Sequence, residues 1–452
     1  MRKLIRKTAI ALFLVVAATH PSSPVVPLVN AADKKEQEKR RVMPVTEQIN
    51  RRLMEARVLI DPASELEEGD DESELPPPDP RGAIELLNKI KDRKSLNPSE
   101  RANVHYLLAF AYYSLEDIPN AVISYEMILA QSPGIKIRFE LTVLRSLYQI
   151  QMAEENFLNA LEYMDRWERL NLGPDLNLQF ARANSWFQLK DYRESLKHAL
   201  ILENLAIEQG KPIKELWWYV QVLDYSELKD IDNVINVLEK LIANYPKKRY
   251  WMHLAAMYSE KDMESQALST YYAAYTQDLL DKESEFVMLA QRLLSAEVPF
   301  EASQILEEGF KKGVIEENEK NIKLLAMAYT MAQEHTKAID AWSDATRFAE
   351  DGTIFYRLAH ALQSEDRHRE AIKAYDDALD AGGMDDESEI HFWKGNLLLQ
   401  LNEYDSAIEA FRESRKGENK TRRRTADQYI KLSLIHISEP TRQAEISYAV
   451  FC

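Results

Sequence analysis

Cysteine is nearly absent from the chain. The 452 residues contain one cysteine, Cys452, at the last position, so no disulfide bond can form within the chain. Glycine is also rare, with 12 residues, and runs of Val, Ile and Thr are scarce. These deficits argue against a β-sheet protein and favour an all-α fold built from short helices.

Recognisable catalytic motifs are missing as well. The chain has no glycine-rich phosphate loop, no HExxH motif and no GxSxG motif. Its histidines are scattered, and the acidic run 385–387 opens a predicted helix, where carboxylates favour the positive end of the helix dipole. We therefore predict a protein that is not an enzyme and has no catalytic, cofactor-binding or metal-binding residues. An enzyme carried on a helical scaffold remains the remote alternative.

Positive charge is in deficit. The chain has 57 Lys and Arg residues against 74 Asp and Glu residues, a formal net charge of −17. Such a chain repels nucleic-acid phosphates and anionic lipid headgroups. We therefore predict no nucleic-acid partner and no direct membrane insertion of the mature chain.

What the sequence does contain is an internal repeat, clearest in residues 216–277. There the pattern of one pair of short amphipathic helices recurs after about 34 residues. The positions Trp218, Gln221, Val222 and Tyr225 correspond to Trp251, Leu254, Ala255 and Tyr258. One such pair cannot bury its own apolar face and must stack on its neighbours. The pattern is typical of tetratricopeptide (TPR) repeats and predicts a right-handed α-solenoid of about ten helix pairs.

The register of this repeat can be followed through residues 44–416. A small residue is expected where the two helices of each pair cross, and such residues recur at spacings of 33 to 39. Large residues of the second helices then fill the space between pairs. The exception is Ala199, which predicts a looser junction in the pair around Ser195. The ten crossing positions are Ala83, Ala121, Ala160, Ser195, Val234, Ala267, Ala302, Ala338, Ala371 and Ala407.

An acidic, proline-rich loop at residues 61–80 splits the first pair. We interpret it as a solvated loop rather than a docking arm, because charge runs usually face water. At the other end, residues 417–431 begin a polar helix of the kind that caps such arrays.

Residues 1–31 have the three parts of a bacterial export signal. A basic start is followed by an apolar core at residues 9–18 and by a small-residue cleavage site at residues 29–31. The apolar run is too short to cross a bilayer comfortably, so we predict cleavage and a periplasmic product. An uncleaved N-terminal anchor is the alternative. A charged linker follows at residues 32–43.

Residues 432–452, LSLIHISEPTRQAEISYAVFC, do not fit the repeat. This segment resembles the conceptual translation of a sequencing-library adapter. The resemblance implies an artefact, which removes Cys452 from the biological protein and leaves the true C-terminus beyond Lys431 unknown.

The first helices of a TPR array line a groove, and here the groove-facing positions are rich in aromatic and amide side chains. Such a surface suits an extended peptide or a helix of a partner protein. The same aromatic residues can instead pack against neighbouring helices, and the sequence leaves both interpretations open. The candidate protein-binding residues are Tyr106, Phe110, Tyr113, Arg145, Gln149, Phe180, Asn184, Phe187, Tyr219, Tyr356, Phe392 and Asn396.

Two segments carry a more specific likeness, residues 234–262 (VINVLEKLIANYPKKRYWMHLAAMYSEKD) and residues 281–334. Together with most of residues 44–414, they resemble the exported TPR proteins found beside TonB–ExbB–ExbD energy-transduction systems of gammaproteobacteria. The resemblance implies a non-enzymatic periplasmic scaffold that assists ferric siderophore uptake, with TonB, ExbB or ExbD components as its protein partners. A periplasmic accessory of peptidoglycan synthesis or outer-membrane assembly is the alternative. The sequence does not give the oligomeric state or the groove face that is used.

Overall fold

The computed structural model describes residues 40–65, 75–171 and 173–450, with side chains described as far as residue 437. All regular elements in these ranges are helices. The predicted export signal, most of the charged linker and the middle of the acidic loop lie outside the described residues.

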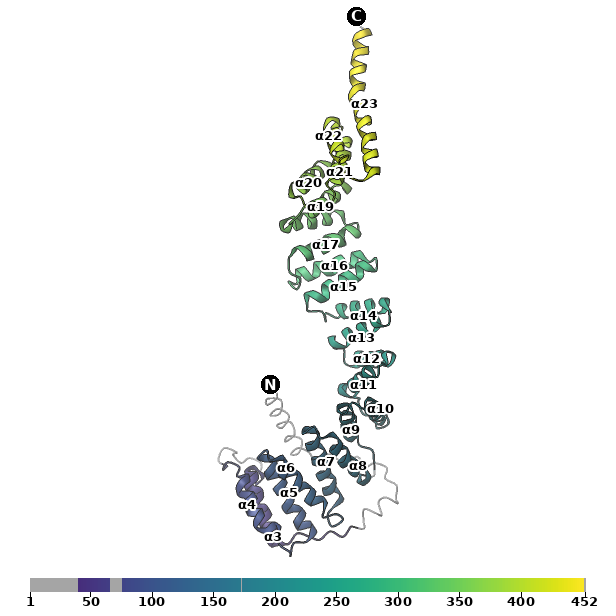
Figure 1. Ribbon diagram of the computed structural model, residues 1–452. Helices are drawn as coiled ribbons and strands as arrows, with labels where there is room; N and C mark the ends of the chain where they lie inside the picture. The colour runs from purple at the N-terminus through teal and green to yellow at the C-terminus, as the bar shows by residue number, and fades with distance from the viewer. Residues whose placement is uncertain (1–39, 66–74, 172, 451–452) are drawn as a thin grey trace. The chain divides into compact units, whose positions relative to one another are not determined.

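The described helices follow one another in pairs joined by short turns (Figure 1). The first pairs are α3 (Glu47–Ile60) with α4 (Pro80–Lys91), α5 (Pro98–Ser114) with α6 (Ile118–Leu129), α7 (Ile137–Ala153) with α8 (Phe157–Leu170), α9 (Leu176–Gln188) with α10 (Tyr192–Glu208), and α11 (Glu215–Glu227) with α12 (Ile231–Asn244). The later pairs are α13 (Lys248–Glu260) with α14 (Glu264–Thr276), α15 (Glu283–Ser295) with α16 (Pro299–Lys311), α17 (Glu319–Met331) with α18 (His335–Ala345), α19 (Thr353–Ser364) with α20 (His368–Ala381), and α21 (Glu387–Gln400) with α22 (Tyr404–Ser414). Helix α23 (Lys420–Val450) follows the last pair.

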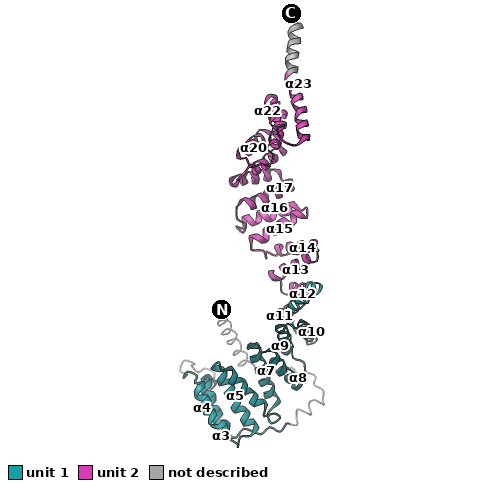
Figure 2. Ribbon diagram, in the orientation of Figure 1, with its two compact units in different colours: residues 1–237 teal, residues 238–452 magenta. Residues whose placement is uncertain are grey.

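The chain divides into two compact units, residues 1–237 and residues 238–452, with the division inside α12 (Figure 2). Within each unit the apolar core runs from one helix pair into the next. One core cluster of the first unit extends from Ala102 on α5 to Ala181 on α9. One of the second unit extends from Ile322 on α17 to Leu397 on α21. The fold is therefore the predicted all-α helical repeat solenoid.

The predicted register is confirmed by burial. All ten crossing residues, from Ala83 to Ala407, are between 0% and 2% exposed. The large second-helix residues predicted to fill the space between pairs are buried as well, among them Met164, Trp342 and Phe411. Close approach of the two helices and stacking of neighbouring pairs thus rest on the same positions.

The turn inside each pair has a recurring geometry. From α5 onward, the second residue after the first helix of each pair has a positive φ, as Glu116 has at 61° and Asn402 at 60°. At the first of these turns, Asp117 N–H donates to the Tyr112 carbonyl and Glu116 N–H donates to the Tyr113 carbonyl. This pairing satisfies carbonyls that the helix end would otherwise leave open, and it reverses the chain direction without glycine.

The first helix pair is split, as predicted, by the acidic loop. Helices α3 and α4 still pack together, and the Asp79 N–H donates to the Leu59 carbonyl across the ends of the loop. The buried carboxylate of Glu100 on α5 ties this pair to the next. It accepts hydrogen bonds from the Thr46 hydroxyl and backbone N–H, at 2.6 and 2.9 Å, and from the Asn97 N–H.

A second buried carboxylate, Glu140 on α7, is 1% exposed and pairs with two arginines. Arg40 Nη1 and Arg166 Nη2 each lie 2.6 Å from one of its oxygens. Burial raises the pKa of Glu140, but the hydrogen bonds and charges of the two arginines outweigh burial and lower the pKa overall. Glu140 therefore holds the end of the charged linker, which contains Arg40, against α7 and α8.

At the C-terminal end, α23 packs on α21 and α22. Arg422 on α23 binds the carboxylates of Asp386 and Glu389, the latter at 2.8 Å. The helix continues beyond Lys431 to Val450, although Leu432, Leu434 and Ile435 are exposed. The origin of residues 432–452 as an adapter stays a prediction.

We expect Glu140→Gln to lower the free energy of unfolding by roughly 2–3 kcal/mol at neutral pH, because it leaves two arginines facing a neutral amide. The folded-state pKa of Glu140 lies below its ordinary value of 4.5, so the advantage of the wild type holds above that pH and shrinks as the pH falls below it. Urea unfolding of both proteins at several pH values measures this. Glu162→Gln, at an exposed position on α8, is the matched control.

Candidate protein-binding surfaces

The predicted groove residues lie on first helices of their pairs, and all except Arg145 are half-buried. On α5, the Tyr106 ring meets the rings of Tyr125 and Phe139 edge-on, with centroids 6.3 and 5.3 Å apart. Tyr113 packs against the same core, whereas Phe110 packs against the core of α3, α4 and α5. Burial raises the pKa of Tyr106, as it does for a phenol that water reaches poorly.

On α7, Arg145 is the one candidate that is exposed rather than half-buried, with 44% of its side chain accessible. Its guanidinium lies 5.5 Å from the centre of the Trp167 ring and 3.8 Å from the Asp175 carboxylate. Gln149, one turn further on, is half-buried. The Arg145 side chain is therefore accessible, but it is held over an aromatic face on its own repeat.

Candidates on α9 and α11 lie at one helix junction. Phe180 packs against Ala183, Ala199 and Val220, which belong to α9, α10 and α11. Phe187 meets Tyr192 edge-on with centroids 5.5 Å apart. Asn184 on α9 and Tyr219 on α11 are half-buried.

In the second unit, Tyr356 and Phe392 take part in contacts between helices, whereas Asn396 bonds within its own helix. The Tyr356 hydroxyl donates to Glu389 at 2.8 Å, and its ring contacts His360 and Tyr375. Phe392 contacts Phe411 and Tyr429. The Asn396 amide donates to the Phe392 carbonyl at 2.9 Å. Most of the predicted aromatic residues thus contribute to packing, and partner binding through them stays a prediction.

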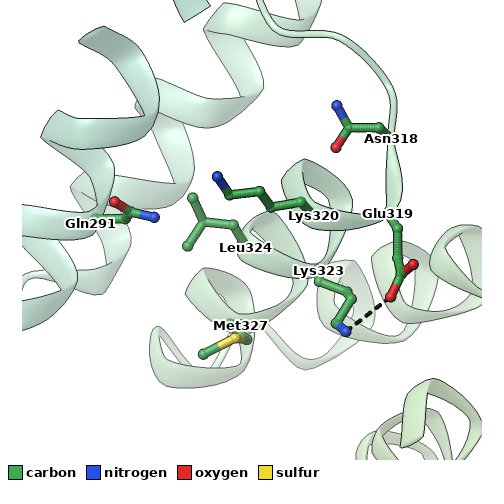
Figure 3. Close-up of a pocket in the computed structure, with 7 residues that line it drawn as sticks. All are labelled: Gln291, Asn318, Glu319, Lys320, Lys323, Leu324 and Met327. Atoms are coloured by element: carbon green, nitrogen blue, oxygen red, sulfur yellow. Dashed lines mark hydrogen bonds and ion pairs between the residues drawn. The ribbon is translucent and has the colours of Figure 1, made fainter. Parts of the chain in front are cut away.

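A more open surface, which the sequence analysis missed, lies between α15 and α17. It is a cleft of about 580 Å³ lined by Gln291, Asn318, Glu319, Lys320, Lys323, Leu324 and Met327 (Figure 3). Lys320, Leu324 and Met327 follow one another along one face of α17, with Gln291 of α15 across from them. Met327 and the nearby Met331 are each 47% exposed.

The cations of this cleft differ in their surroundings. Lys323 donates to Glu319 at 3.1 Å, one turn back on the same helix. Lys320 is exposed and makes no hydrogen bond or ion pair with the described residues. The cleft therefore offers flexible apolar side chains, an amide and a cation, a combination that suits a peptide better than a reaction.

Two further observations concern the described residues alone. They contain no group of three or more His, Cys, Asp or Glu side chains that could hold a metal ion. None of their helices combines the length and the apolar character that crossing a bilayer requires.

A comparison with known proteins shows which proteins the chain resembles. Residues 356–420, which include α20, α21 and α22, match a family model described as tetratricopeptide repeat. No curated protein matches the chain. This part of the chain is thus similar to TPR repeats, a fold typical of protein-interaction scaffolds.

Solved TPR structures resemble the chain at low sequence identity. A TPR protein from Parabacteroides merdae is 13% identical and covers 63% of this chain and 99% of its own, with a TM-score of 0.35. The TPR2AB domain of yeast Sti1, solved in complex with pHSP90, is 15% identical and covers 65% and 98%, with a TM-score of 0.28. YrrB, a TPR protein with an unusual peptide-binding site, is 15% identical and covers 42% and 97%, with a TM-score of 0.34.

We expect Tyr106→Ala to lower the free energy of unfolding by about 2 kcal/mol, because it opens a cavity between α5, α6 and α7. Ile123→Ala on α6, where the side chain is 55% exposed, should change it by less than about 0.5 kcal/mol. Chemical denaturation of the two variants measures both. If Tyr106→Ala is as stable as wild type, Tyr106 does not contribute to packing, and its interpretation as a contact residue for a partner is favoured.

Proposed function

We propose that the protein is a non-enzymatic periplasmic scaffold that binds a component of a TonB–ExbB–ExbD system and thereby assists ferric siderophore uptake. The interaction role follows from the TPR fold. The system and the compartment rest on the sequence likeness and on the export signal predicted in residues 1–31.

One observation carries this proposal furthest. One of the two segments with the more specific likeness, residues 281–334, contains both helices of the open cleft, α15 and α17. The part of the chain that points to the TonB system therefore also presents an accessible surface on a TPR array. We assign partner binding to this cleft.

The side chains of the cleft define how a polypeptide is held there. Leu324, Met327 and Met331 adapt to an apolar anchor residue, since methionine has several low-energy conformations and a polarisable sulfur. Lys320 and Gln291 are free to bind a carboxylate or the backbone of an extended segment. A few such residues supply most of the energy at a protein interface.

The test is a double variant, Lys320→Glu with Met327→Ala, in the full chain carrying an affinity tag in its native host. We expect wild type to co-purify a TonB, ExbB or ExbD component after crosslinking in cells, and the double variant to retain at most about one tenth of it. Quantitative mass spectrometry measures the retained amounts. Lys373→Glu with Met54→Ala, which changes an exposed lysine on α20 and an exposed methionine on α3, is the matched control.

The two parts of the proposal fail in different ways. If wild type retains no component of this system, or retains proteins of peptidoglycan synthesis or outer-membrane assembly instead, the assignment to the TonB system is wrong. If the double variant retains as much partner as wild type, the system stands and the cleft is not the binding surface.

A further inference from the structure

The interior of the junction between α9, α10 and α11 is polar. Ser195 at the crossing position and Asp224 on α11 are both 0% exposed, and Gln221 is 1% exposed. Glu203 on α10 is 8% exposed. Four polar side chains therefore occupy a region where the repeat requires an apolar filling, next to the small Ala199.

The two buried carboxyl groups of this junction are held differently. Glu203 accepts a hydrogen bond from Trp218 Nε1 at 2.9 Å on one oxygen and from Gln221 Nε2 at 2.7 Å on the other. Asp224 has a single side-chain hydrogen-bond partner, Ser195, whose Oγ lies 2.9 Å from Asp224 Oδ2. Its other oxygen, Oδ1, is buried and has no hydrogen-bond partner. Asp224 forms no ion pair in the described part of the chain.

The geometry around Ser195 indicates where the protons are. Ser195 Oγ lies 2.9 Å from Asp224 Oδ2 and also 2.9 Å from the Ala183 carbonyl oxygen. A serine hydroxyl has one hydrogen and can donate to only one of these oxygens. If Asp224 is ionised, the other contact joins two oxygens with no hydrogen between them. If Asp224 is protonated, it donates to Ser195, Ser195 donates to Ala183, and both contacts are hydrogen bonds.

The surrounding charges do not stabilise an ionised Asp224. Apart from Asp224, the titratable and charged side chains of the three helices are Arg182 on α9, Tyr192, Arg193, Glu194, Lys197, His198, Glu203 and Glu208 on α10, and Glu215, Tyr219, Tyr225 and Glu227 on α11; Asp230 and Asp232 lie around the start of α12. None of these charges contributes to the pKa shift of Asp224, whose causes are burial and the Ser195 hydrogen bond. Arg182 is engaged by Asp165 and Glu168 at 2.7 and 2.9 Å.

We propose that the Asp224 carboxyl group is neutral in the folded repeat and that its ionisation opens the junction of α9, α10 and α11. We call this group a proton-controlled latch. Loss of the proton leaves a buried charge with one unsatisfied oxygen, and the junction must open to admit water. Burial raises the pKa of Asp224 to about 7, with the hydrogen bond of Ser195 acting in the opposite direction, so the latch responds near neutral pH.

This latch affects a candidate binding surface. Phe180 packs across the three helices of the same junction, and Tyr219 lies on α11. Opening the junction changes the spacing of these side chains, while the cleft between α15 and α17 belongs to the second unit. The latch is thus independent of the partner's identity and of the cleft.

The expected pH dependence has a definite sign. In the unfolded chain the carboxyl group titrates near its ordinary value of 3.8, whereas in the folded chain it titrates near 7. Between these values the folded state holds a proton that the unfolded state lacks. The folding equilibrium therefore becomes about tenfold less favourable for each pH unit gained in this window, and the loss is complete above it.

Asp224→Asn in the full chain tests the latch. The amide mimics the neutral acid, so we expect the stability of the variant to lack the pH dependence that the Asp224 proton causes. The folding equilibrium constant of the variant divided by that of wild type should therefore rise about tenfold per pH unit between about pH 5 and 7. Urea unfolding followed by tryptophan fluorescence measures this, because Trp186, Trp217 and Trp218 lie on α9 and α11. Glu208→Gln, at an exposed position on α10, is the control that should leave the slope unchanged.

A second measurement does not depend on how the variant folds. Carbon NMR of wild type labelled at the aspartate carboxyl carbons should show one carboxyl group that titrates near pH 7, and this titration should be missing in Asp224→Asn. Absence of any aspartate that titrates above about pH 6 in wild type overturns the proposal. So does an unchanged pH slope in a folded Asp224→Asn variant.

Discussion

The structure depends on one constraint, that a pair of short amphipathic helices cannot remove its apolar surface from water by itself. Each pair needs a small residue where its helices cross and a large residue that reaches into the next pair. The ten crossing positions satisfy the first need with side chains that are at most 2% exposed. The core clusters satisfy the second, because they run through successive pairs, as the one from Ala255 on α13 to Ala328 on α17 does.

Polar groups enter this apolar interior at a few places, and their partners differ. Glu100 and Glu140 join the first pairs to the preceding chain, and Arg422 joins α23 to the last pair. Each of these groups has hydrogen bonds that offset its removal from water. Asp224 lacks them on one oxygen, which distinguishes it from the carboxylates that simply hold the array together.

The repeat register could be predicted from the sequence because close packing dictates it. A residue larger than alanine, serine or valine does not fit at the crossing, so the spacing of small residues reveals the helix pairs directly. The split of the first pair could also be predicted, since the prolines of the loop cannot continue a helix and its run of acidic residues is too polar to bury. The helical end of the chain could not, because α23 extends past Lys431 with exposed leucines that follow no repeat pattern.

The proposed binding surface, the cleft between α15 and α17, was harder to predict for a physical reason. A groove-facing position on a first helix also borders the second helix of its own pair and the next first helix. A large aromatic ring there packs against those neighbours and is half-buried, as Tyr106, Tyr356 and Phe392 are. A flexible or charged side chain gains less from such packing and stays in solvent, as Met327 and Lys320 do. In this chain the aromatic candidates therefore mark packed positions, whereas Met327 and Lys320 mark a surface of α17 that the described residues leave open.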